Sequence, residues 1–372
     1  MKVLFCGGGT AGHINPAIAV AEELINQDKN ASILFIGRED GKENGLIIKA
    51  GFELKTIKIQ GLKRSFSPEN LKRITTAIKA KKKAEEIIRE YRPDVILGTG
   101  GYVCWPVIIA GHKMGIPAVL HESNISPGLT TKLLCRKCKK ILLGNKETEK
   151  LLNKNVETMV VGNPLRGAFG KISRNNARAK IGVRPEELLI VSFGGSIGAE
   201  RINEVIMEII EKHSSVKKEI KHIHATGERY FLKNKEKAKE YQKNGCRILP
   251  FIEDMPTVLH AADIVICRSG AMTLAELSAV GVASILIPSP NVTDNHQYKN
   301  AKQLCDADAA VMIEEKNLSA ETLEKLLIDI ENDKNGRKTK AKNIKALSTP
   351  NSAKMIINEL FALKKSAKNA AG

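Results

Sequence analysis

The sequence predicts an α/β protein built from two Rossmann-like halves. Short runs rich in Val, Ile and Leu are each followed by a glycine-rich or polar turn and then by a helical segment, and both halves repeat this order. The chain is 42% hydrophobic but only 4% aromatic, which is typical of parallel sheets built from aliphatic side chains. With 372 residues it is long enough for two domains.

The first predicted strand, Lys2–Cys6, runs into the turn GGGTAG, which precedes a helix. This spacing is the G-x-G-x-x-G pattern of dinucleotide-binding folds. An NAD site would also need an acidic residue at the end of the second strand. Glu39 fits poorly there because Arg38 precedes it, although an NADP site that uses Arg38 stays open.

His13 stands at the start of the helix that follows this turn, where a dinucleotide fold leaves room for a pyrophosphate. A histidine beside glycines is exposed enough to act as a general base. The alternative is a histidine that caps the helix or lies in the loop without a chemical role.

Two more turns of the first half follow predicted strands. GTGGYV follows the strand Asp94–Leu97, and HESN follows the strand Ala118–Leu120, with Asn124 as a candidate ligand for an amide or hydroxyl. Three such loops open on one edge of the predicted sheet, whereas a nicotinamide cofactor needs one. The number of loops therefore favours a different ligand.

The second half repeats the pattern. The strand Leu188–Phe193 enters GGSIGA, where Ser196 and backbone amides can cradle a phosphate. A strand at 264–267 leads through a turn into a helix at 271–280. The N-terminus of that helix favours a negative charge, and Glu276 is predicted as an exposed carboxylate that accepts hydrogen bonds from a diol. A polar loop, Asn291–Gln297, completes a site suited to a nucleotide that carries a sugar.

Three further segments have predicted roles. The polar segment 162–185 is predicted to be an interdomain hinge, with Arg166 near its start. The segment 69–90 is predicted to be a helix whose apolar residues face the core, surrounded by many lysines and arginines; the apolar residues are Leu71, Ile74 and Ile78. The last helix, Ser352–Lys365, is predicted to pack against the first domain.

The net charge of +18, from 59 Lys and Arg against 41 Asp and Glu, favours an anionic partner: nucleic acid, lipid headgroups or a phosphorylated substrate. A general basic bias spread over solvated faces is the alternative. The lysines of 69–90 favour reversible contact with a membrane surface.

The seven cysteines are typical of reduced thiols in the cytosol, and the lone pair Cys135 and Cys138 has no partners for a zinc site. No signal peptide or membrane-spanning segment is predicted.

Seven motifs occur in order: GGGTAGHINPAIAVAEEL, GTGGYV, HESN, GNPLR, GGSIGAERIN, CRSGAMTLAE and DNHQYKNA. Over residues 1–310 the chain thereby resembles the MurG family of peripheral-membrane glycosyltransferases of bacterial cell-wall synthesis. The resemblance implies a GT-B fold, with two Rossmann-like domains whose parallel sheets face each other across a cleft. The expected domains are an acceptor and membrane-facing domain (1–163), a UDP-GlcNAc-binding domain (164–345) and a C-terminal helix that returns to the first domain (346–372).

The resemblance further implies transfer of GlcNAc from UDP-GlcNAc to the C4 hydroxyl of the MurNAc sugar of lipid I, with inversion, to give lipid II. The implied partners are these two substrates, the anionic inner leaflet at the cytoplasmic face of the cell membrane, and other cell-wall enzymes, but no nucleic acid. No cofactor is implied, and no Asp-x-Asp pair stands in either glycine-loop region to indicate a metal clamp.

Residue roles come from the same resemblance. His13 resembles the proposed base or an acceptor-side residue. Glu276 is expected on the ribose and Gln297 on the GlcNAc hydroxyls. The remaining expected donor contacts are Thr10, Ala11, Gly12, Asn124, Arg166, Ser196, Ile252, Ala271, Met272, Thr273, Leu274 and Ala275.

The chain departs from the family pattern at five positions. Ser123, Ile197 and His296 stand where the family usually has Gln, and Cys104 and Trp105 replace small residues beside the second glycine-rich loop. Three other functions stay open: a related lipid-acceptor glycosyltransferase such as a diacylglycerol glycosyltransferase, an NADP-dependent oxidoreductase, and a non-catalytic membrane or nucleic-acid adaptor.

Overall fold

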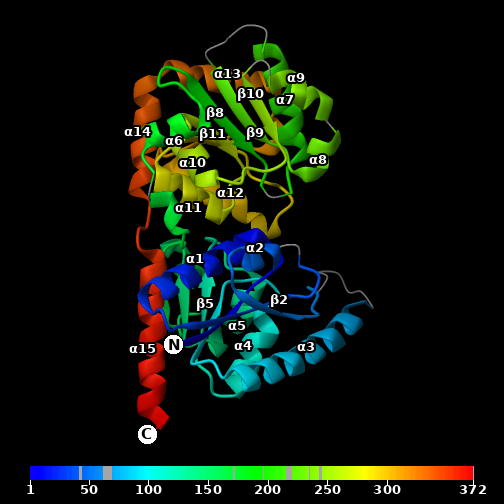
Figure 1. Ribbon diagram of the computed structural model, residues 1–372, viewed down its shortest axis with the longest axis vertical. Coiled ribbons are helices and arrows are strands. Elements are labelled where there is room, and N and C mark those ends of the chain that lie inside the picture. The colour runs from blue at the N-terminus through cyan, green and yellow to red at the C-terminus, as the bar shows by residue number, and fades with distance from the viewer. Residues whose placement is uncertain are drawn as a thin grey trace. The chain divides into compact units, whose positions relative to one another are not determined.

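The computed structural model describes residues 1–41, 44–61, 69–170, 172–195, 197–214, 220–233, 235–242 and 245–371. The chain forms two compact units (Figure 1). The first consists of Met1–Gly167 and Thr349–Gly372, and the second of Ala168–Ser348.

The first unit contains a seven-stranded parallel sheet in the order β3-β2-β1-β4-β5-β6-β7. The strands are β1 (Lys2–Cys6), β2 (Ser32–Arg38), β3 (Glu53–Ile57), β4 (Val95–Gly98), β5 (Ala118–Glu122), β6 (Lys140–Leu143) and β7 (Thr158–Val160). Aliphatic side chains from both faces of the sheet lie in separate buried clusters, so the central strands are apolar at nearly every position.

Helices cover both faces of this sheet. They are α1 (Ala11–Gln27), α2 (Asn44–Lys49), α3 (Glu69–Tyr91), α4 (Cys104–Lys113), α5 (Leu129–Leu134) and α15 (Ser352–Ala371), with short 3-10 turns η1 (Cys135–Lys137) and η2 (Lys146–Leu151). Helix α15 packs beside α1, and its Ile356, Ile357 and Leu360 are fully buried. It continues to Ala371, six residues beyond the predicted end.

The second unit contains a six-stranded parallel sheet in the order β10-β9-β8-β11-β12-β13. The strands are β8 (Leu188–Phe193), β9 (Ile220–Ala225), β10 (Cys246–Leu249), β11 (Ile264–Cys267), β12 (Ala283–Leu286) and β13 (Val311–Met312). The helices are α6 (Arg174–Ile181), α7 (Glu200–Ser214), α8 (Glu228–Lys233), α9 (Lys235–Gln242), α10 (Met255–Ala261), α11 (Ala271–Val280), α12 (His296–Asp306), α13 (Ala320–Asn332) and α14 (Lys334–Ala346), with 3-10 turns η3 (Gly167–Gly170), η4 (Thr293–Asn295) and η5 (Glu315–Asn317).

The predicted apolar stripe of helix α3 does not face the core. Ile74 and Ile78 are 47% and 51% exposed, so that prediction is wrong for both residues, and the Leu71 side chain lies outside the described part. The buried face of α3 comes instead from its second half, at Ala80, Ala84, Ile87 and Ile88. The helix is 23 residues long, and among its described side chains Ile74 and Ile78 of the first half are exposed.

Two predicted segments differ from the observed structure. Part of the expected hinge is the regular helix α6, which Ser173 caps by accepting a hydrogen bond from Asn176 N–H at 3.3 Å. One predicted helix over 229–243 is described as two, α8 and α9.

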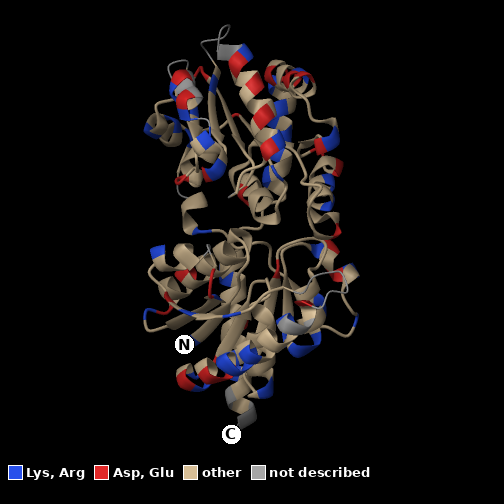
Figure 2. Ribbon diagram, turned by 90° about the vertical axis from the view of Figure 1, so that its right-hand side faces the viewer, with Lys and Arg blue, Asp and Glu red and all other residues tan. Residues whose placement is uncertain are grey.

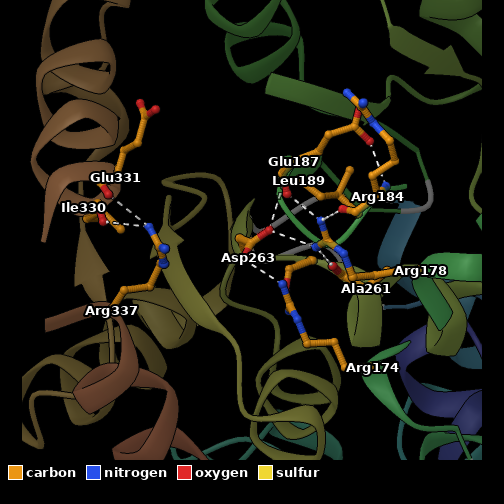
Figure 3. Close-up of polar contacts among 11 residues, drawn as sticks. Arg174, Arg178, Arg184, Glu187, Leu189, Ala261, Asp263, Ile330, Glu331 and Arg337 are labelled. Atoms are coloured by element: carbon orange, nitrogen blue, oxygen red, sulfur yellow. Dashed lines mark hydrogen bonds and ion pairs between the residues drawn. The ribbon is translucent and has the colours of Figure 1, made fainter. Parts of the chain in front are cut away.

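Helix α6 is held to the sheet by a cluster of charged groups around Asp263 (Figure 3). Arg174 donates to one carboxylate oxygen of Asp263 at 2.7 Å, and Arg178 donates to the other at 3.1 Å. Arg178 is 4% exposed and also donates to the carbonyls of Ala261, Arg184 and Glu187. These contacts lie at the edge where strands β8 and β11 begin.

Candidate active site

The strand orders locate a ligand site in each unit. Read from the third strand, both sheets follow the order 3-2-1-4-5 of the Rossmann fold. The order reverses between β1 and β4 in the first unit and between β8 and β11 in the second. Ligands of such sheets bind beyond the carboxyl ends of those strands. The glycine-rich loops predicted from the sequence follow these four strands.

In the first unit, the loops after β1 and β4 contact each other closely. Gly8 N–H donates to the Gly100 carbonyl at 3.3 Å. Gly101 has φ +83°, and a Cβ there would lie 1.9 Å from the Gly8 oxygen. Only glycine fits this approach, so the two loops form one surface.

His13 lies on this surface. Its Nδ1 is 2.9 Å from the Gly8 carbonyl oxygen and 3.4 Å from Thr10 Oγ1. A carbonyl oxygen only accepts, so in the neutral ring Nδ1 carries the proton and Nε2 keeps its lone pair. The ring also packs on Gly100, where a Cβ would lie 2.7 Å from His13 Cδ2. The backbone therefore fixes the tautomer of the neutral ring.

The N-terminus of helix α1 is open to an anion. Thr10 is extended at the N-cap, and no side chain caps the helix. The first N–H groups of a helix lack partners inside it and carry a partial positive charge. Thr10, Ala11 and Gly12 therefore stand with His13 at one positively polarised edge.

Asn124 belongs to a loop that a buried carboxylate organises. Glu122, 6% exposed at the end of β5, accepts hydrogen bonds from Asn124 N–H at 3.0 Å, from Asn124 Nδ2 at 3.3 Å and from Gly128 N–H at 2.9 Å. Thr131 Oγ1 donates to the same carboxylate at 2.6 Å. Ser123 is buried, with its Oγ 3.4 Å from His121 Nδ1.

In the second unit, helix α11 begins directly after β11 and also lacks a side-chain cap, with the extended Gly270 at its N-cap. Ala271, Met272, Thr273, Leu274, Ala275 and Glu276 form its first two turns. Glu276 is half-buried, so the prediction of an exposed carboxylate is wrong. Burial raises the pKa of Glu276 to about 7. Within the described residues no hydrogen bond or ion pair engages its carboxylate, which remains available to a ligand.

Gln297 lies in the first turn of helix α12 rather than in a loop, which corrects the predicted 291–297 loop. Its Oε1 accepts from Ser289 N–H at 2.9 Å, and its carbonyl accepts from Ser269 Oγ at 2.8 Å. Asn300 Nδ2 donates to the Ser269 carbonyl at 3.2 Å. These bonds hold the start of α12 against the turn that leads into α11.

The loop after β8 is described except for Ser196, so the predicted phosphate contact of Ser196 lies outside the described residues. Gly198 has φ +78° and a Cβ there would lie 2.1 Å from the Thr226 oxygen. Ile197 is 84% exposed on this loop. Ile252 is buried in the segment after β10.

Arg166 is not brought to the loop surface of the first unit. Its guanidinium pairs with the Glu22 carboxylate of helix α1 at 2.6 and 3.2 Å. Glu22 is eleven residues beyond Ala11, about 16 Å along the helix from its N-terminus. A phosphate contact by Arg166 requires this pair to open, and that role stays a prediction.

The structure therefore gathers Thr10 to His13 in one unit and Ala271 to Glu276 with Gln297 in the other. Sequence reasoning missed Glu122, Ser269 and Asn300, which hold the loops rather than face a ligand. All three stand inside recognised motifs: HESN, CRSGAMTLAE and DNHQYKNA. A polar residue at or directly after the end of a predicted strand was the available signal for Glu122 and Ser269.

Comparisons with known proteins agree with this architecture. The model of the glycosyltransferase family 28 N-terminal domain matches residues 3–143, and that of the C-terminal domain matches residues 189–356. The crystal structure of Acinetobacter baumannii MurG superposes with a TM-score of 0.74 at 27% identity, covering 97% of this chain and 99% of that one. The predicted GT-B fold is confirmed.

Two curated relatives are similar over most of their length. The UDP-N-acetylglucosamine--N-acetylmuramyl-(pentapeptide) pyrophosphoryl-undecaprenol N-acetylglucosamine transferase of Acetivibrio thermocellus is 41% identical over 356 residues, covering 96% of both chains. The transferase of the same name from Thermoanaerobacter sp. is 45% identical over 328 residues, covering 87% of this chain and 89% of the relative. The chain belongs to glycosyltransferase family 28.

Proposed function

We propose that the chain is a UDP-GlcNAc-dependent N-acetylglucosaminyltransferase that moves GlcNAc to the C4 hydroxyl of the MurNAc sugar of lipid I and so makes lipid II for peptidoglycan. The near full-length identity of 41% to a transferase named for this reaction carries the proposal. A related lipid-acceptor glycosyltransferase is the second candidate, and an acceptor assay separates the two.

The chemistry follows from the two loop surfaces. Inverting transfer needs a base that removes the acceptor proton while the C4 oxygen attacks the anomeric carbon and UDP leaves. His13 Nε2 takes that proton, since Nδ1 is bound to the Gly8 carbonyl. The charge of the departing diphosphate is stabilised by the uncapped N-terminus of α11, and we place Ser196 and Arg166 on the same phosphates.

The donor roles are proposals for individual residues. The Glu276 carboxylate has no partner among the described residues, and we assign it to the ribose, from whose two hydroxyls it would accept hydrogen bonds. Gln297 donates hydrogen bonds to the GlcNAc hydroxyls through its side-chain N–H groups, since its Oε1 already accepts from Ser289 N–H. Ile252 offers backbone groups to uracil. Thr10, Ala11, Gly12 and Asn124 contact the donor from the first unit. We assign acceptor binding to residues 1–163 and donor binding to residues 164–345.

We further propose that the protein acts peripherally at the cytoplasmic face of the cell membrane. No helix within the described ranges is long and apolar enough to cross a bilayer. Helix α3 exposes Ile74 and Ile78 beside the exposed lysines Lys79, Lys82 and Lys83. The short helix α5 adds exposed Leu129 and Leu133. Apolar side chains among lysines suit insertion into an anionic surface, although Lys and Arg also lie on the helices of both units (Figure 2).

The deciding experiment follows lipid II formation from UDP-GlcNAc and a lipid I analogue, with other UDP-sugars as competing donors. His13→Ala should lower turnover by ~10²–10⁴ with little change in UDP affinity, because a positioned base contributes that range. His112→Ala, an exposed histidine of α4, is the matched control and should leave turnover unchanged. Near-normal turnover of His13→Ala would remove His13 as the base.

Membrane contact is tested by flotation with vesicles of phosphatidylcholine alone or mixed with phosphatidylglycerol. The wild type should float with the anionic vesicles, and the double variant Ile74→Ser, Ile78→Ser should float less. Ile328→Ser removes an isoleucine of similar exposure from α13 and serves as the control. Equal flotation of all three proteins would contradict a role for α3.

A further inference from the structure

Cys104 begins helix α4 directly after the turn Thr99–Val103, at a position where a smaller residue was expected. Its side chain is fully buried and lies within the turn that packs on His13. We infer that Cys104 is a positioning residue for His13, which it holds in its basic tautomer through Gly100. The inference rests on the proposed role of His13 as the base.

The thiol contacts both backbone polar groups of Gly100, its N–H and its carbonyl oxygen. Gly100 N–H donates to Cys104 Sγ at 3.3 Å. Sγ in turn lies 3.2 Å from the Gly100 carbonyl oxygen and 3.3 Å from the Cys6 carbonyl oxygen, so its single proton is shared between two acceptors. One side chain therefore satisfies a donor and two acceptors at the base of the turn.

Gly100 needs such a restraint because its backbone is unusually free. Its φ is +111°, and the next residue, Gly101, has φ +83°. Glycine loses more conformational freedom on folding than any other residue, so two in succession favour a mobile turn unless other groups fix them. The turn has no side chain at either position with which to fix itself.

Gly100 controls His13 by two routes. The His13 ring rests on the Gly100 Cα, where an added Cβ would lie 2.7 Å from Cδ2. The Gly100 carbonyl also accepts the Gly8 N–H at 3.3 Å, and the Gly8 carbonyl binds His13 Nδ1 at 2.9 Å. A shift of Gly100 therefore moves both the backbone on which the His13 ring packs and the Gly8 carbonyl that fixes the tautomer of the ring.

The groups around the Cys104 thiol are consistent with a positioning role. Burial raises the pKa of Cys6 well above its usual value, and the neighbouring Cys104 thiol raises it further. Thr99 Oγ1 also donates to the Cys6 carbonyl at 3.4 Å. The Cys6 thiol stays protonated and uncharged, and both cysteines lie in an apolar cluster of buried side chains.

Three variants test the inference by lipid II kinetics. Cys104→Ala removes the contacts to Gly100 and should lower kcat about 10-fold, because small displacements of a catalytic group have effects of this order or larger. The KM for UDP-GlcNAc should stay within about 2-fold, because the thiol is fully buried and is not exposed to the donor. Cys104→Ser keeps a donor and an acceptor and should restore most of kcat. Cys135→Ala removes another buried thiol that donates to a backbone carbonyl, that of Lys132 at 3.3 Å, and should leave kcat unchanged.

The imidazole ¹⁵N shifts of His13, measured in the full chain without substrate, give a second readout that does not depend on activity. The wild type and Cys104→Ser should show the Nδ1-protonated tautomer, and Cys104→Ala a mixture. Equal kcat and equal ¹⁵N shifts for Cys104→Ala and Cys135→Ala would overturn the inference. If Cys104→Ala does not fold, Cys104→Val, which fills the site without a donor or an acceptor, takes its place: a mixture of tautomers supports the inference, and unchanged shifts with unchanged kcat oppose it. If the wild type makes no lipid II, the proposed function fails, while the ¹⁵N shifts still decide whether Cys104 positions His13.

Discussion

The two edges of the six-stranded sheet differ in how their charged groups are used. Where β8 and β11 begin, the Asp263 carboxylate binds Arg174, Arg178 and the Leu189 N–H, so it is shared among three donors (Figure 3). Where the same strands end, Glu276 has no partner within the described residues and burial raises its pKa to about 7. An ion pair also exists at this edge, between Arg268 and Glu315, but it leaves Glu276 untouched.

We infer from this difference that the charged groups at the first edge serve stability, whereas Glu276 at the second edge serves binding. Paired and hydrogen-bonded charges at the first edge anchor helix α6, and removing one partner would leave others buried without compensation. A carboxylate without a partner costs free energy in the folded state and is retained where a ligand supplies the missing hydrogen bonds. Substitutions at the two edges should therefore change different measured quantities.

The largest expected effect is at the first edge. Arg178→Met should lower the free energy of unfolding of the second unit by about 3–5 kcal/mol, because a buried ion pair is broken and backbone carbonyls lose a donor. Arg174→Met removes a more exposed arginine from the same carboxylate and should cost at most about 1 kcal/mol. Urea denaturation measures both. Equal effects of the two variants would contradict the view that burial at this edge provides the stability.

Between the two edges, the ring nitrogens of His222 and His224 both lie 2.7 Å from Ser192 Oγ. Burial lowers the pKa of His224 from 6.5 to about 4, so the unfolded chain binds a proton more readily than the folded one. The stability from this group is complete above pH 6.5, decreases as the pH falls, and is lost by about pH 4, a change of about 3 kcal/mol.

Glu276 changes stability in the opposite direction over part of this range, so the measurement should be a difference. The free energy of unfolding of the wild type minus that of His224→Gln, followed from pH 7 to pH 4, cancels the Glu276 contribution. The difference should fall as the pH decreases. A constant difference would show that His224 does not titrate in this interval.

At the second edge the expected effect is on binding. Glu276→Ala should weaken UDP-GlcNAc binding by about 1–3 kcal/mol, because hydrogen bonds to a charged acceptor are lost, while the free energy of unfolding changes little or rises. Wild-type affinity should fall as the pH drops through about 7, since the carboxylate becomes protonated. Isothermal titration of Glu276→Gln, which does not titrate, should give a pH-independent affinity. Unchanged donor affinity in Glu276→Ala would remove Glu276 from the ribose.

The smallest expected effect concerns the loop that leads into α11. Ser269 is fully buried and its Oγ donates to the Gln297 carbonyl at 2.8 Å. Ser269→Ala should cost about 1 kcal/mol of stability, the usual net value of one buried hydrogen bond. Thermal unfolding measures it, with Ser289→Ala, which changes a half-buried serine, as the control. A loss of stability as large as that of Arg178→Met would mean that contacts at the second edge also contribute strongly to the stability of the second unit.

The sequence predicted most elements because parallel strands buried on both faces are continuous aliphatic runs, as in β8 and β11. The glycine-rich loops were also predicted, since positive φ values and close backbone approaches require glycine at Gly101 and Gly198. Helix α3 was misjudged because helical spacing of apolar residues is the same whether a neighbour covers them or not. Ile74 and Ile78 show this, since they keep the spacing and remain exposed.

By itself, the sequence determined the α/β class, the repeated strand-turn-helix order and the position of His13 and Glu276 at helix starts, because local spacing specifies these features. Only the tertiary structure decided which loops meet. The contact of Gly8 with Gly100, the pairing of Arg166 with Glu22 and the partial burial of Glu276 join residues through space or depend on surrounding atoms. Tautomer, pKa and ion pairing depend on those neighbours, and residue spacing along a chain does not specify them.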